Sequence, residues 1–276
     1  MILEEYYPTL KKVYFCEFPP GIGGDFFISL YGLSNKKFFR PNINDEQSLV
    51  RRLNEYQLLP GCNLGGKWID KLDIMKEKIA TDLKIWGKPQ QYPEYINFAS
   101  HPYGIRSHQT INPHEERTRE HAYHYVQKLT NVPINKVVIV PSTFGSAMFS
   151  VFYTFSNDNF TISRDYNYIL DHLDILLNFY CEVDNNISLI SDTDSIVLDH
   201  IDYLLTNKDM KELVSKVVDF DDIDISMFNI LLDYYKGKLN RYNTWVEELK
   251  QHPIFDKVYQ MYISHPGKKE IDKWIS

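Results

Sequence analysis

The stretch Val13-Tyr-Phe-Cys-Glu-Phe18, followed by Pro19-Pro-Gly-Ile-Gly-Gly24 and Asp25-Phe-Phe-Ile-Ser-Leu-Tyr31, says most about the architecture of this chain. Its first six residues are mostly aromatic or β-branched and predict a buried strand. Three glycines within four positions predict a tight loop before a helix. Backbone N–H groups at such a helix start suit a phosphate or sulfate group. A simple strand–turn–helix junction explains the same glycines equally well.

Length and composition predict an ordinary globular protein. The chain has 276 residues, 43% of them hydrophobic and 24% charged, so we expect one α/β domain over residues 1–276. A net charge of −7 argues against nucleic acid as a partner. Three scattered cysteines, no signal peptide and no long apolar run predict a cytoplasmic protein with reduced thiols and no membrane segment. The oligomeric state stays open.

Further along the chain, apolar runs alternate with helical periodicity. We expect strands over 95–100, 136–141 and 216–220, and helices over 45–59, 68–86, 113–129, 166–181 and 225–235. This alternation predicts a parallel sheet with helices on both faces, a three-layer α/β fold. Ligands of such sheets bind beyond the carboxyl ends of the strands, which here lead into residues 19–25, 101–107 and 141–145.

Two other patterns are weaker. The segment Gly61-Cys-Asn-Leu-Gly-Gly-Lys67 matches the spacing of a phosphate-binding loop, but Trp68 stands where that loop needs Ser or Thr, so we interpret it as an interhelical turn. Five histidines lie between residues 101 and 124 without a convincing metal-ligand spacing, and we expect no metal site. His101, at the end of a predicted strand, is either a general base or a loop histidine bonded to backbone.

Taken in order, these segments resemble the sulfotransferase family, particularly divergent members encoded by phages and marine microbes. The family's glycine loop corresponds to residues 20–27, its strand ending in Thr-His to Ser100-His101, and its third strand to residues 137–142 with Ser150 two turns later. Residues 218–223 and the helix after them match the family's last strand and helix. The resemblance implies a P-loop-like fold and sulfuryl transfer from PAPS (3′-phosphoadenosine 5′-phosphosulfate) to a small-molecule or glycan hydroxyl, without a metal.

The resemblance also implies roles for individual residues. His101 would deprotonate the acceptor, and Ser142 and Ser150 would lie at the 3′-phosphate, with Arg106 as a compensating charge. The 5′-phosphosulfate would be bound by Pro20, Gly21, Ile22, Gly23, Gly24, Asp25 and Phe26. The chain departs from the family because the loop has no Lys or Arg and Ser142 replaces an Arg. Two alternatives therefore remain, a non-catalytic binding or structural protein of viral type and a nucleotide-sugar glycosyltransferase.

Overall fold

Five parallel strands form the centre of the protein. The computed structural model describes residues 2–18, 21–34, 61–63, 94–100, 126–154, 162–181 and 195–275. The predicted helices over 45–59 and 68–86, and most of the one over 113–129, lie outside these ranges. Within them the strand order is β2-β3-β1-β4-β5, which confirms an α/β fold with a parallel sheet. The strands are β1 (Lys12–Glu17), β2 (Gly61–Asn63), β3 (Tyr95–Ser100), β4 (Ile134–Ile139) and β5 (Ser195–Leu198).

The central strand β1 is the aromatic run that the sequence predicted. Lys12 pairs with Tyr95 on β3, and Val13 pairs with Ile134 on β4. The strand is buried from its second residue onward, as expected for a strand with neighbours on both edges. Tyr14 projects from it to stack on a tyrosine of the following helix, Tyr31, with ring centroids 4.0 Å apart. This contact fixes that helix on one face of the sheet.

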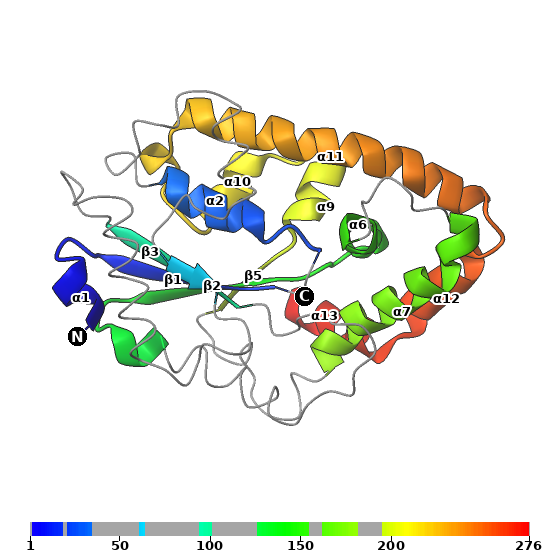
Figure 1. The fold of residues 1–276 in the computed structure, drawn as a ribbon, viewed down its shortest axis with the longest axis horizontal. Helices are drawn as coiled ribbons and strands as arrows, with labels where there is room; N and C mark the ends of the chain where they lie inside the picture. Colours follow the sequence, from blue (N-terminus) through cyan, green and yellow to red (C-terminus); the bar gives the residue numbers. More distant parts are fainter. Residues whose placement is uncertain are drawn as a thin grey trace.

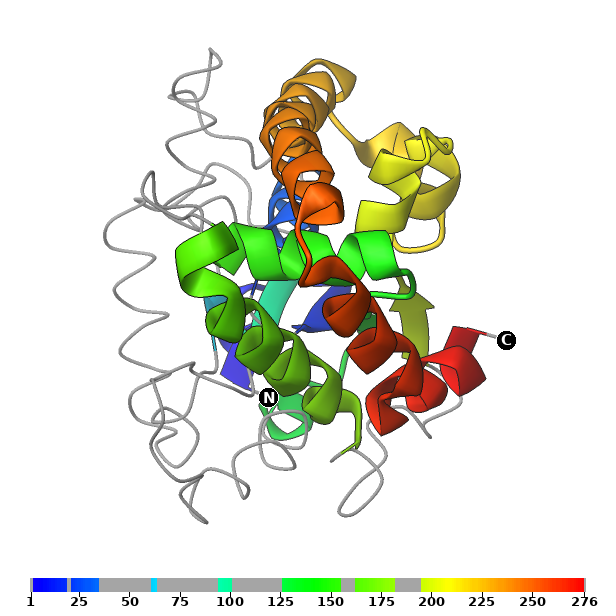
Figure 2. The same cartoon turned by 90° about the vertical axis from the view of Figure 1, so that its right-hand side faces the viewer.

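Apart from α1 and the helical residues 126–129, the helices fall into two groups (Figures 1 and 2). α2, α9, α10 and α11 lie on one side of the sheet, whereas α6, α7, α12 and α13 lie beyond the carboxyl ends of the strands. No helix among the described residues is long and apolar enough to span a membrane. The helices are α1 (Ile2–Tyr6), α2 (Asp25–Leu33), α6 (Phe144–Thr154), α7 (Ile162–Cys181), α9 (His200–Leu205), α10 (Met210–Ser215), α11 (Ile225–Gln251), α12 (Phe255–Ser264) and α13 (Pro266–Ile275), with a 3₁₀ turn at Phe220–Asp222.

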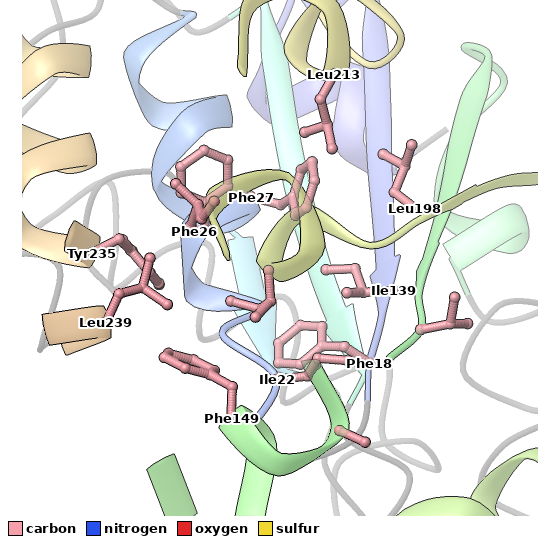
Figure 3. Close-up of a cluster of buried hydrophobic side chains, with 14 of the residues drawn as sticks. Phe18, Ile22, Phe26, Phe27, Ile139, Phe149, Leu198, Leu213, Tyr235 and Leu239 are labelled. Atoms are coloured by element: carbon pink, nitrogen blue, oxygen red, sulfur yellow. The ribbon is translucent and has the colours of Figure 1, made fainter. Parts of the chain in front are cut away.

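One hydrophobic cluster connects the sheet with both groups of helices. It contains buried side chains from β1, β4 and β5 together with others from α2, α6, α7 and α11. Figure 3 shows part of it, with Phe26 of α2 beside Tyr235 of α11. Helix α11 has 27 residues and extends far beyond the predicted 225–235, because apolar side chains continue at helical spacing as far as Leu249. That the whole chain forms a single domain stays a prediction, since part of it lies outside the described ranges.

Two local predictions are wrong. The strand expected over 216–220 is instead the turn that follows α10 and leads into the 3₁₀ turn at Phe220–Asp222; the N–H groups of Val217 and Val218 in it both donate to the carbonyl of Val214. Val217 and Val218 are buried in the core without pairing to a strand, so their β propensity does not decide their conformation. The interhelical turn expected at residues 61–67 begins instead with the short strand β2, which pairs with β3.

Candidate functional site

The boundary between β1 and β4 is where this sheet offers a binding site. The chain leaves β1 toward β2 and β3 on one side, and it leaves β4 toward β5 on the other. Connections that diverge from adjacent parallel strands open a crevice at the carboxyl edge, where α/β proteins bind their ligands. Glu17 pairs with Ser100 on β3 and with Val138 on β4, so the three predicted strand ends do lie together.

The loop over residues 21–24 lies at this edge and leads directly into α2. Gly21 and Gly23 have φ of 83° and 74°, values that favour glycine. A Cβ on Gly23 would lie 3.1 Å from Nε2 of His200 and 3.3 Å from the Tyr235 ring, and one on Gly24 would clash with the Phe18 ring. Gly21 and Gly23 are therefore required for the turn, and Gly23 and Gly24 for the close approach of aromatic rings.

The turn from β4 into α6 is held by reciprocal hydrogen bonds. The N–H of Ser146 donates to Oγ1 of Thr143 over 3.2 Å, and the N–H of Thr143 donates to Oγ of Ser146 over 3.1 Å. This is a capping box in which serine takes the place of the usual glutamate. It orients the start of α6 beside the glycine loop and leaves the Ser146 hydroxyl proton for other acceptors.

Asp199 joins this turn to the next strand. It follows β5, and its Oδ2 accepts hydrogen bonds from the N–H of Ser142 (2.6 Å), from the Ser142 hydroxyl (2.6 Å) and from the Ser146 hydroxyl (2.7 Å). Its Oδ1 caps α9 by accepting from the N–H of Asp202. Burial raises the pKa of this carboxyl above its ordinary value, and the four hydrogen bonds oppose part of that effect. Asp199 is the polar centre of the carboxyl edge.

His200, the first residue of α9, lies directly against the glycine loop. Its ring is fully buried, stacks on Phe26 and lies edge-to-face with Phe27, with ring centroids 5.2 Å and 5.1 Å apart, respectively. The backbone of Gly23 is its hydrogen-bonding neighbour. Burial lowers the pKa of His200 to about 3, and the neighbouring backbone of Gly23 opposes only part of this shift. The imidazole is therefore neutral at ordinary pH.

The neutral imidazole predicts a loss of stability in acid. In the unfolded chain His200 takes up a proton below its ordinary pKa of 6.5, whereas the folded protein resists protonation down to about 3, so stability falls as pH decreases through that window. Relative to His200→Phe, the wild type should lose about 2 kcal/mol of unfolding free energy between about pH 7.5 and about pH 5. Urea titrations of both proteins at the two pH values measure this. A difference that does not change with pH contradicts it.

Lys238 places a positive charge on the same side of the sheet. Its Nζ donates to the Tyr153 hydroxyl over 2.6 Å and lies 4.1 Å from the centre of the Tyr234 ring. It also lies 5.1 Å from the centre of the Tyr235 ring, the same ring that borders Gly23. A single aromatic ring therefore separates this buried ammonium group from the glycine loop.

The predicted site residues fall into three groups. Gly21, Ile22, Gly23, Gly24, Asp25 and Phe26 lie at the loop and the start of α2, although the Phe26 ring is buried against His200 and the Phe26 N–H donates to the carbonyl of Gly23. Ser142 lies at the edge with its hydroxyl engaged by Asp199, and Ser150 is buried on α6. Pro20, His101 and Arg106 lie outside the described residues; His101 directly follows β3.

Asp199, His200 and Lys238 are the residues that sequence reasoning missed. The first two follow the short apolar run Ser195-Ile-Val-Leu198, and an aspartate after such a run is the signal that was available. Lys238 gave no signal, because a lysine within a long helix is usually exposed. Within the described part of the chain, no group of three or more His, Cys, Asp or Glu is placed to hold a metal ion.

Comparisons with protein-family models, with curated proteins and with solved structures find no match to this chain. Its function is therefore inferred from the geometry of the site. The N–H groups of Phe26 and Phe27 at the start of α2 already donate to the carbonyls of Gly23 and Gly24, so the positive end of this helix and the buried ammonium group of Lys238 are the features that favour an oxyanion at this edge.

Proposed function

We propose that this chain is a sulfotransferase-like enzyme that transfers a sulfuryl group from PAPS to the hydroxyl of a small-molecule or glycan acceptor. The observation that carries the proposal is the glycine loop between the central strand β1 and α2, at the β1–β4 boundary of a parallel sheet. The order of the first three motifs along the sequence supports it, whereas residues 218–223, expected as the family's last strand, form a turn and a 3₁₀ helix. A three-layer, P-loop-like arrangement of the whole chain is part of the proposal.

Sulfuryl transfer suits a site at the positive end of a helix. The acceptor oxygen forms a bond to sulfur while the bond from sulfur to the bridging oxygen breaks, which releases adenosine 3′,5′-bisphosphate. The acceptor proton passes to a base, for which we propose His101, the residue after β3. The transition state needs positioning and neutralisation of charge more than a covalent intermediate. The N-terminus of α2 and the ammonium group of Lys238 supply favourable electrostatics for that charge.

Adenosine 3′,5′-bisphosphate is expected to stabilise the protein against heat, whereas UDP and GDP are not. At about 100 times its dissociation constant, a ligand that binds only the folded state adds about 2.7 kcal/mol. Thermal unfolding with the three nucleotides at equal concentration measures this. Stabilisation by UDP alone favours the glycosyltransferase alternative, and no response to any of them contradicts nucleotide binding.

A non-catalytic binding protein is the second candidate, and one observation favours it. The hydroxyl of Ser142 is held by Asp199, and the ring of Phe18 lies against Gly24 where a donor nucleotide would approach the loop. The two candidates differ in turnover. Incubation with PAPS and a panel of hydroxyl acceptors yields a sulfated product if the chain is an enzyme, whereas stabilisation by the nucleotide without any product indicates a binding protein.

A further inference from the structure

Lys238 of α11 and Tyr153 of α6 form a close polar pair between two packed helices. Lys238 is 8% exposed, and its ammonium group lies near the centres of three aromatic rings, 4.3 Å from Tyr153, 4.1 Å from Tyr234 and 5.1 Å from Tyr235. Its Nζ is only 2.6 Å from the Tyr153 hydroxyl oxygen. The contact with Tyr153 is therefore made mainly to the oxygen, whereas the other two tyrosines contribute their rings.

The packing of α6 against α11 holds this pair in place. The Tyr242 hydroxyl of α11 donates to the carbonyl of Gly145 at the start of α6 over 2.9 Å. The Tyr153 ring stacks on that of Phe149, with ring centroids 5.9 Å apart. Because both partners are fixed by their surroundings, the ammonium group stays beside the phenol oxygen.

An ammonium group at this distance changes the chemistry of the phenol. A hydrogen bond from a cation to the charged form of an acid favours loss of the proton from that acid. Such charge-assisted bonds are about twice as strong as neutral ones, and the low dielectric among buried rings strengthens them further. We therefore expect Tyr153 to ionise more readily than an ordinary tyrosine.

We propose that Tyr153 is a nucleophilic modification site, whose phenolate oxygen takes up an activated sulfonyl or sulfuryl group. The phenol proton passes to solvent, the oxygen forms a bond to sulfur, and the leaving group departs with the electron pair of its bond to sulfur. The oxygens on that sulfur carry negative charge, which the ammonium group of Lys238 attracts.

The exposure of the two side chains agrees with these roles. Tyr153 is half-buried, whereas Lys238 is buried, so a reagent from solvent meets the nucleophile before the cation that activates it. The proposal goes beyond the proposed function, because it requires neither the nucleotide nor the glycine loop.

Benzenesulfonyl fluoride is the probe for this site, and peptide mapping by mass spectrometry measures the label on each residue. Near neutral pH and with limiting reagent, Tyr153 should be labelled faster than Tyr166 on α7, although Tyr166 is 41% exposed. Lys238→Met should slow the labelling of Tyr153 at least about tenfold, because the uncharged side chain no longer favours the phenolate. Lys238→Arg keeps the positive charge and should restore most of the rate.

Lys236→Met is the matched control, because it removes the same charge from the same helix. Lys236 is exposed and pairs with Asp233, also on α11. Its loss should leave the labelling of Tyr153 unchanged. A decrease that is confined to Lys238→Met therefore comes from the contact with Tyr153 and not from the net charge of α11.

Three results would overturn the proposal: a wild type in which Tyr153 is not labelled ahead of Tyr166 and Lys238, a folded Lys238→Met variant with the wild-type rate, or an equal loss in Lys236→Met. If Lys238→Met does not fold, the pH dependence of labelling in the wild type replaces it. The rate at Tyr153 should then level off at a lower pH than the rate at Tyr166, and parallel profiles overturn the proposal.

Discussion

Replacing Asp199 by alanine is expected to lower the free energy of unfolding by about 3 kcal/mol. The substitution removes the acceptor of four hydrogen bonds, and the N–H of Ser142 cannot turn toward another partner as a hydroxyl can. It also removes the cap of α9 and the connection between β5 and the turn that starts α6. Chemical denaturation followed by circular dichroism measures the loss.

Asp209→Ala is the matched control for this substitution. Asp209 caps α10, another six-residue helix, through the N–H of Lys211, and it makes that contact at the exposed surface. Loss of such a cap costs about 1 kcal/mol. If the two alanine variants lose the same amount, Asp199 is only a helix cap, and its contacts to Ser142 and Ser146 add nothing to stability.

Gly267→Ala is expected to destabilise the protein by about 3 kcal/mol or more. Gly267 lies at the start of α13, where a Cβ would overlap the backbone carbonyl of Leu177 on α7. Backbone cannot turn aside as a flexible side chain can, so α13 has to shift away from α7, the helix against which it packs most closely. Thermal unfolding of the variant measures the effect.

Gly237→Ala has the opposite expected sign and serves as the control. Gly237 lies within α11, and a Cβ there would meet nothing within 4 Å. Alanine in the interior of a helix is favoured over glycine by about 1 kcal/mol, so this variant should unfold at a higher temperature. If both alanine variants are stabilised, α13 does not pack against α7 as closely as the structure shows.

Strong local patterns allowed much of the sheet to be predicted from sequence. The aromatic run of β1 and the alternating residues of β3 have few other interpretations, and the glycines before α2 set both the loop and the helix start. The predictions failed for short segments. β2 has three residues and β5 has four, so neither shows a period, and their pairing with β3 and β4 decides their conformation.

Only the part of the candidate site that lies within one continuous segment could be predicted from the sequence. The glycine loop was identified because all its residues are adjacent in sequence. The contact of Asp199 with Ser142, and that of His200 with Gly23, join residues far apart along the chain. Sequence alone gives Ser142 a free hydroxyl, whereas the fold engages it with a carboxylate. Similarly, Lys238 acquires its position beside the loop only because α11 crosses α6 and α2.

The pairing of β1 has a consequence for the order in which the protein forms during synthesis. β1 leaves the ribosome first among the strands, but its pairing partners are synthesised much later: Lys12 pairs with Tyr95, and Val13 pairs with Ile134. At about 5–20 residues per second, this aromatic strand stays without its neighbours for several seconds. During that time its aromatic side chains and unpaired strand edges are exposed and prone to aggregation. We expect the yield of native protein to respond strongly to chaperones and to translation speed between residues 35 and 134.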